Sequence, residues 1–193
     1  MQDLASDAAE LIARLGRGPV HFAGVSMGGM TAQALAALYP DSVLSITVAN
    51  SAAHYDAAAR QGWQTRMDTV AAQGVAAIAD GALQRWLSPD FLARNPQRVA
   101  QMRATLVEIA AKPYAQACAA VAGIELHETN PSIRCPALVI GGTLDAATPM
   151  ALSQQIADGI AGAELAPIEA AHISCVEQPE VFAQLLDGFI QRV

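Results

Sequence analysis

The chain has 193 residues, 53% of them hydrophobic, with a formal net charge of -7 and a mean hydropathy of +0.28. This length suits one domain with a sizeable core, and the hydrophobic content excludes a disordered chain. The acidic balance, with only 11 Lys and Arg residues, argues against nucleic acid and against an anionic membrane surface as partners.

The first quarter of the chain alternates predicted helices and strands. Apolar residues at helical spacing predict a helix over 3–15, which a glycine-rich segment ends. An apolar strand follows over 20–25, and then a helix over 30–39 that ends before a proline. A second apolar strand over 43–49 completes a strand-helix-strand unit, which is typical of a parallel sheet.

The pattern changes over the middle of the chain. Ala-rich helical stretches broken by Gly and Pro continue without a convincing strand, which predicts a helical insertion. Both tryptophans and most arginines lie in it. This concentration suits a lid over a polar ligand, although solvated helix faces and core aromatics are the more common explanation. We predict a core over 1–50 and 134–193 and a lid over 51–133.

Alternating strands and helices then resume. A strand over 136–141, a turn, and a helix over 149–160 are followed by a last short strand over 164–168 and a helix over 179–190. The whole pattern predicts an α/β fold with a mostly parallel sheet and helices inserted between its strands.

A Gly-x-Ser-x-Gly motif at Gly24 to Gly28 lies between the first strand and the helix after it. This context predicts a nucleophile elbow, in which the two glycines relieve crowding and the Ser Oγ is lifted off the sheet. Ser26 is therefore the candidate nucleophile, and the N–H of Met27 is a candidate oxyanion donor. A glycine-rich turn that merely joins strand to helix is the alternative.

An acid and a histidine follow the last two predicted strands. Asp145 and His172 complete the order Ser, acid, His with Ser26, each on a loop at the carboxyl end of a strand, as in α/β-hydrolases. Taken singly, Asp145 could cap a helix and His172 could be a surface histidine. Glu169 and Glu177 are rival acids in less suitable places. The order and the locations together predict a catalytic triad.

No cofactor or metal is expected. The glycines of the elbow do not form G-x-G-x-x-G, which disfavours a dehydrogenase, and no metal-ligand spacing is apparent. Cys118, Cys135 and Cys175 form no CxxC pair and fit free thiols in a reducing compartment. The first residues show no basic region followed by an apolar core, and no apolar run approaches membrane-span length. We expect a cytoplasmic protein.

The sequence resembles the 3-oxoadipate enol-lactonases, a branch of the α/β-hydrolase superfamily. The resemblance covers nearly the whole chain and rests on residues 21–30, 49–53, 83–86, 141–149 and 171–179, and on Trp63 with Arg66. The elbow is common to the superfamily, whereas the segments around Asp145 and His172 and the Arg-Trp pair at 85–86 are more specific.

The resemblance implies an α/β-hydrolase fold with a helical lid and the hydrolysis of an anionic enol-lactone to 3-oxoadipate. Ser26 would attack the carbonyl, and His172 would act as base and then as acid. Because this substrate carries a free carboxylate, an arginine of the lid is an attractive partner for it. The substrate-binding candidates in the lid are Trp63, Arg66, Arg85 and Trp86.

Two features depart from the family. After Ala53 the family usually has a basic residue and a glycine, whereas this chain has His54, Tyr55 and Asp56. The family also begins with some four strands and a loop that supplies a second oxyanion N–H, whereas this chain begins at the helix over 3–15. We therefore expect a truncated product or a fragment, with the strand over 20–25 as an edge prone to self-association and with little activity.

Two other functions remain open. The first is another lidded α/β-hydrolase, such as a carboxylesterase, a cofactor-free perhydrolase or a carbon-carbon bond hydrolase, because the fold and the triad serve many substrates. The second is a fragment without catalytic activity that pairs its exposed strand with a partner.

Overall fold

Four apolar segments form one parallel sheet in the computed structural model, which describes residues 1–193. The strands are β1 (Val20–Val25), β2 (Val43–Ala49), β3 (Ala137–Gly142) and β4 (Glu164–Ile168), and they pair in the order β1-β2-β3-β4. The helices outside the middle of the chain are α1 (Gln2–Leu15), α2 (Met27–Leu38), α8 (Met150–Gly159), α9 (Ser174–Glu177) and α10 (Pro179–Ile190).

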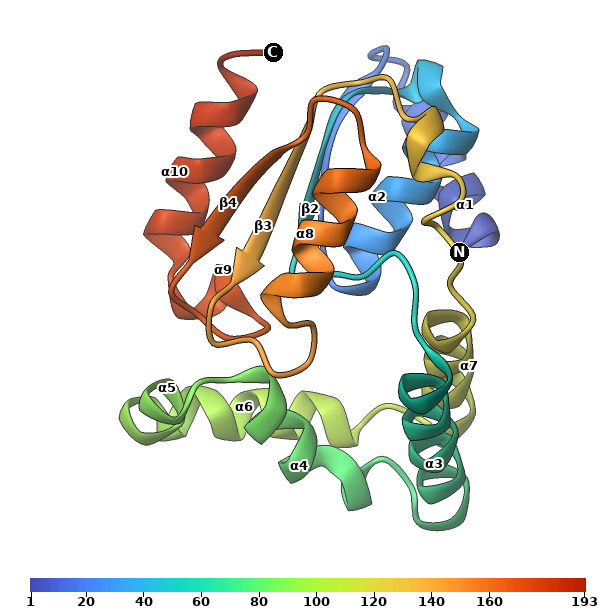
Figure 1. Ribbon diagram of the computed structural model, residues 1–193. Helices are drawn as coiled ribbons and strands as arrows, with labels where there is room; N and C mark the ends of the chain where they lie inside the picture. Colours follow the sequence, from blue (N-terminus) through green and yellow to red (C-terminus); the bar gives the residue numbers. More distant parts are fainter.

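The two central strands, β2 and β3, are buried on both faces except at Leu44, as strands of parallel sheets are, whereas β1 and β4 are only partly buried. Alternate residues of β3 point to opposite sides, so Val139 packs in the cluster that α1, α2 and α8 cover, whereas Ile140 packs in the cluster that includes Phe189 of α10. Figure 1 shows α10 apart from α8 and α2 across the strands. Because all three strand pairs are parallel, the carboxyl ends of the four strands lie at the same end of the sheet.

Five helices fill the chain between β2 and β3. They are α3 (Ala57–Gln73), α4 (Ala76–Trp86), α5 (Pro89–Arg94), α6 (Pro96–Val107) and α7 (Ala111–Ala122). They lie beyond the end of the sheet to which the strand arrows point (Figure 1). A small apolar cluster that includes Val70, Ala79 and Leu106 packs α3, α4, α6 and α7 together. We call these five helices the lid; the domain boundaries at residues 50 and 134 stay a prediction.

The predicted α/β-hydrolase fold is confirmed, including the helical insertion without a strand. The predicted ranges of β1, β2, β4 and α10 match the structure residue for residue. Helix α2 begins at Met27, immediately after Ser26 as expected of an elbow, and ends at Leu38, one residue before the predicted end. The single turn α9 had not been predicted. None of the helices combines the length and the apolar character needed to cross a bilayer.

Strand β1 is an edge of this sheet. It pairs with β2 on one side and has no strand on the other. Along it, His21 and Ala23 are exposed, whereas Val20 and Phe22 are half-buried against the main apolar cluster. An edge of this kind offers free backbone N–H and C=O groups to another chain. Self-association through β1 stays a prediction.

Candidate active site

Ser26 occupies a strained position between β1 and α2. Its φ of 56° and ψ of -115° lie where non-glycine residues are rare. Two hydrogen bonds fix it there: its N–H donates to the carbonyl of Ala49 at 2.9 Å, and the hydroxyl of Ser51 donates to its carbonyl at 2.8 Å. Strain that neighbouring residues hold in place is typical of functional sites.

The glycines around Ser26 differ in what they permit. A Cβ on Gly24 would lie 2.2 Å from the carbonyl carbon of Gly28, and a Cβ on Gly29 would lie 2.8 Å from the Cβ of Ser51. A Cβ on Gly28 would meet nothing within 4 Å. The prediction that both Gly24 and Gly28 relieve crowding is therefore wrong for Gly28, because the first turn of α2 passes over Gly24 while Gly28 itself faces the cavity described below.

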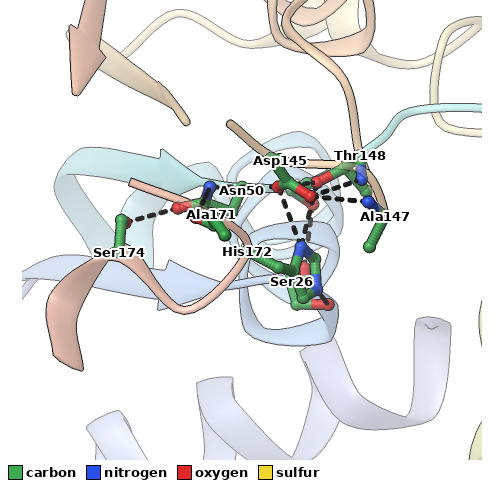
Figure 2. Close-up of polar contacts among 9 residues, drawn as sticks. Ser26, Asn50, Asp145, Ala147, Thr148, Ala171, His172 and Ser174 are labelled. Atoms are coloured by element: carbon green, nitrogen blue, oxygen red, sulfur yellow. Dashed lines mark hydrogen bonds and ion pairs between the residues drawn. The ribbon is translucent and has the colours of Figure 1, made fainter. Parts of the chain in front are cut away.

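The structure brings Ser26, Asp145 and His172 together (Figure 2). The Nε2 of His172 lies 2.9 Å from the Oγ of Ser26, and its Nδ1 lies 2.9 Å from the Oδ2 of Asp145. Each residue follows a different strand, β1, β3 and β4 respectively, at the carboxyl end. Asp145 and His172 are buried. A neutral imidazole in this place can take the hydroxyl proton while the carboxylate holds its tautomer.

Asp145 is held by donors on both oxygens. The N–H groups of Ala147 and Thr148 donate to Oδ1 at 2.7 and 2.8 Å, and the hydroxyl of Thr148 donates to Oδ2 at 2.7 Å. Burial by itself would raise the pKa of this carboxyl, but the hydrogen bond and charge of His172 and the donors of Thr148 together lower the pKa below its usual value. The carboxylate therefore stays ionised beside the imidazole.

Asn50 is a further support of the triad that the sequence analysis did not identify. It follows β2 in a left-handed conformation, with φ of 47°. Its Nδ2 donates at 3.1 Å both to the Oδ2 of Asp145 and to the carbonyl of Ala171, and its Oδ1 accepts from the hydroxyl of Ser174 (Figure 2). Asn50 thus links the loops after β3 and β4. A polar residue directly after a buried strand was the available signal.

Met27 is the first residue of α2. The N–H groups of the first helical turn have no acceptor within the helix, and the positive end of the helix dipole is located there. Met27 and Ser26 both line the same cavity. The arrangement suits an N–H that donates to an oxyanion formed on the carbon that Ser26 attacks.

A cavity of about 1080 Å³ opens in front of Ser26. Its walls include Ser26 and His172 from the sheet side, and 12 of its 23 lining residues are hydrophobic. All four substrate-binding candidates of the lid, which were chosen from the sequence, line it as well: Trp63, Arg66, Arg85 and Trp86. The structure therefore brings every predicted site residue to this cavity except Asp145, which lies behind His172.

Two arginines of the cavity wall are without an acidic partner. The guanidinium of Arg66 lies 5.6 Å from the ring centre of Trp63 and 5.7 Å from that of Trp86, and its buried Nε has no hydrogen-bond partner. Neither Arg66 nor Arg85 belongs to any ion pair, whereas several other arginines do. The Nε itself is closed to solvent, but other atoms of Arg66 line the cavity, so the positive charge of its guanidinium can attract an anion there.

Tyr55 is a buried residue of the cavity wall that the sequence marked only as a departure from the family. Its ring lies 6.1 Å from that of Trp63. Burial raises the pKa of its hydroxyl to about 12, although the charge of Arg85 acts in the opposite direction. At neutral pH the hydroxyl therefore keeps its proton and can donate it in a hydrogen bond.

Comparison with known proteins assigns the family. A protein-family model described as "alpha/beta hydrolase fold" matches residues 1–179. The chain belongs to this family. Two 3-oxoadipate enol-lactonases of Acinetobacter baylyi, numbered 2 and 1, are 35% and 34% identical to it over its full length, and the matches cover 71% and 72% of those proteins.

A solved structure agrees with these relatives. The enol-lactonase from Burkholderia xenovorans LB400 superposes with a TM-score of 0.92 at 33% identity, over 97% of this chain and 71% of that one. Within the α/β-hydrolases, the chain is thus a member of the 3-oxoadipate enol-lactonase family, and it is a hydrolase.

Proposed function

We propose that this α/β-hydrolase is a serine hydrolase that opens 3-oxoadipate enol-lactone to 3-oxoadipate, a step of aromatic catabolism in the β-ketoadipate pathway. The observation that supports it best is the unbroken relay from the Oγ of Ser26 to His172 and Asp145, with both contacts at 2.9 Å. The names of the relatives point to the same reaction.

The geometry allows a two-step reaction. The Oγ of Ser26 attacks the lactone carbonyl while the Nε2 of His172 takes its proton, and the N–H of Met27 donates to the oxyanion. The ring C–O bond then breaks, and the enol oxygen receives the proton from His172 and becomes the ketone by tautomerisation. A water molecule, deprotonated by His172, cleaves the acyl-enzyme and releases 3-oxoadipate.

The free carboxylate of the substrate needs a positive partner, because the chain as a whole carries a charge of -7. Arg66 and Arg85 are the unpaired cations of the cavity wall. Arg66 is the better supported of the two, because the rings of Trp63 and Trp86 hold its guanidinium in the cavity wall. Trp63 and Trp86 then serve as apolar walls for the ring.

Labelling and turnover test the catalytic part of the proposal. The purified chain is treated with a fluorophosphonate, the adduct is located by mass spectrometry, and hydrolysis of the enol-lactone is followed spectroscopically. We expect the adduct on Ser26, its loss in His172→Ala, and turnover of the lactone. A folded sample without a Ser26 adduct would reject the serine mechanism.

Matched arginine variants test the carboxylate site. Arg66→Met keeps the length and apolar contacts of the side chain but removes its charge. A charged hydrogen bond contributes about 1.5–3 kcal/mol, so KM for the anionic lactone should rise by about 10-fold to 100-fold. KM for the neutral methyl ester of the same lactone should not change. If Arg85→Met shows this difference and Arg66→Met does not, the carboxylate binds at Arg85.

The same pair of substrates separates the alternatives. A general carboxylesterase would accept the neutral ester as readily as the anion, and a carbon-carbon bond hydrolase would accept neither. The three cysteines are all free, which suits a reducing compartment, so the proposed setting of the reaction is the cytoplasm. The proposed partner is a small anionic lactone rather than nucleic acid or a membrane surface.

A further inference from the structure

Three side chains with metal-ligating atoms meet at the base of the lid. His54 lies in the segment that enters the lid before α3, and Glu125 and His127 lie in the segment that leaves it after α7. The sequence suggested no metal site because His54 and Glu125 are separated by 71 residues. The grouping lies outside the triad, although His54 also lines the cavity.

The distances within this group fit a metal ion. The Nδ1 atoms of His54 and His127 lie 3.3 and 3.4 Å from the Oε2 of Glu125. Bonds of about 2.0–2.1 Å to a tetrahedral Zn²⁺ place neighbouring ligand atoms about 3.3–3.4 Å apart. All three ligand atoms lie within 4.8 Å of one another, so rotation of an exposed imidazole ring closes the remaining side.

Hydrogen bonding alone explains the arrangement less well. Both imidazole nitrogens approach one carboxylate oxygen, and both contacts are longer than the 2.9–3.0 Å at which N–H···O bonds are most frequent. The two rings also lie close, with centres 4.9 Å apart. Arg60 binds the other oxygen of Glu125, so both imidazoles share its Oε2.

The surroundings hold the ligands in place. His54 and Glu125 form an antiparallel bridge, and the N–H of Leu126 donates to the carbonyl of Ala53 at 2.7 Å. Arg60 contacts the Oε1 of Glu125 and is itself anchored by its Nε, which donates to the carbonyl of Tyr55 at 2.8 Å. Outer partners that orient a ligating carboxylate in this way are common around protein metal sites.

We propose that His54, Glu125 and His127 form a reversible Zn²⁺ site that ties the entering and leaving segments of the lid together. Imidazole and carboxylate ligands suit Zn²⁺ and its first-row neighbours, whereas Mg²⁺ and Ca²⁺ prefer oxygen alone. The side chains are about half exposed, so a water can occupy the fourth position and the ion can exchange with solvent.

Titration with ZnCl₂ tests the site. Calorimetry on the intact protein should show one equivalent of Zn²⁺ and no binding of Mg²⁺, and saturating Zn²⁺ should raise Tm by about 4 °C or more. Co²⁺ should give the intense visible absorption of a tetrahedral site. The absence of a thiolate charge-transfer band would exclude the free cysteines as ligands. Failure of the intact protein to bind Zn²⁺ would overturn the proposal.

Matched variants locate the ion. His127→Ala and Glu125→Gln should abolish both the binding and the rise in Tm while leaving the metal-free Tm within about 1 °C, because both residues are exposed. His21→Ala removes another exposed histidine, far along the chain on β1, and should bind Zn²⁺ normally. Loss of binding in His172→Ala with retention in His127→Ala would place the ion at the triad and reject the proposed site.

Discussion

The two walls of the cavity use their polar groups differently. On the sheet side, both oxygens of Asp145 accept hydrogen bonds, and His172 contacts both Asp145 and Ser26. On the lid side, the buried Nε of Arg66 has no partner and Arg85 has no ion pair. The sheet wall is organised before any substrate arrives, as catalysis requires, whereas the lid wall keeps its charges free for a ligand.

Removal of the nucleophile on the sheet wall should cause the largest loss of catalysis. We expect Ser26→Ala to lower kcat by about 10⁴-fold or more, because the relay then ends at a methyl group. The fall in kcat is measured by steady-state hydrolysis of the enol-lactone and of a p-nitrophenyl ester. Binding of the product should remain near normal, since the lid wall is untouched. A residual kcat within 10-fold of the parent would assign the attack to another group.

Substitution of the two glycines of the elbow by alanine should have effects of very different size. Gly24→Ala should lower kcat by about 100-fold and Tm by about 5 °C, because its Cβ would overlap the backbone of Gly28 at 2.2 Å. Gly28→Ala is the matched control, with free space around its Cβ, and should change Tm by less than about 2 °C. Equal effects of the two substitutions would show that backbone crowding does not govern the elbow.

Thr148→Val should weaken the hydrogen bonding that holds the carboxylate of Asp145. It removes the donor at 2.7 Å from the Oδ2 of Asp145, so we expect kcat to fall about 10-fold and the unfolding free energy at neutral pH to fall by about 1–2 kcal/mol. Thr105→Val, exposed on α6, is the control.

The pH dependence of this loss follows from the lowered pKa of Asp145. A carboxyl whose pKa is lower in the folded protein stabilises it above the unfolded pKa, near 3.8, and the stabilisation is lost as pH falls through the folded pKa. Urea unfolding from neutral pH to below 3.8 should therefore show the gap between parent and Thr148→Val closing in acid. A gap that stays constant would indicate lost packing only.

The smallest effect is expected where the two walls meet. Tyr55→Phe removes the neutral hydroxyl of a residue that lines the cavity but keeps the ring near Trp63. KM for the lactone should rise about 3-fold to 10-fold, with kcat within about 2-fold of the parent. Tyr39→Phe, outside the cavity, should have no effect. A loss confined to kcat would instead place the Tyr55 hydroxyl at the reacting atoms.

The sequence predicted the sheet wall better than the lid wall, for a physical reason. Strands β1 and β2 are short, mainly apolar runs, and parallel strands bring their carboxyl ends to the same end of the sheet, so the order of Ser26, Asp145 and His172 implies their proximity. Their supporting contacts depend on side-chain directions in loops. The hydrogen bonds of Asn50 and Thr148 were therefore missed.

In the lid, the sequence identified the right residue types but not their arrangement. Arg66, Arg85 and the tryptophans were chosen because they cluster along the chain, and they line the cavity. The burial of Tyr55 and the approach of His54 to Glu125 depend on how five helices pack, which helical periodicity does not determine. The free space beside Gly28 can likewise be recognised only from the structure.

The hydrogen bond between Leu126 and Ala53 has a wider consequence. It joins the residue that leaves the lid to the residue that enters it, at 2.7 Å. The whole lid is thus an insertion whose two ends lie side by side at the core. An insert of another length or fold could replace it without moving a strand of the sheet, provided that its ends are one strand spacing apart. The chemistry and the choice of substrate can therefore evolve as separate modules on this chain.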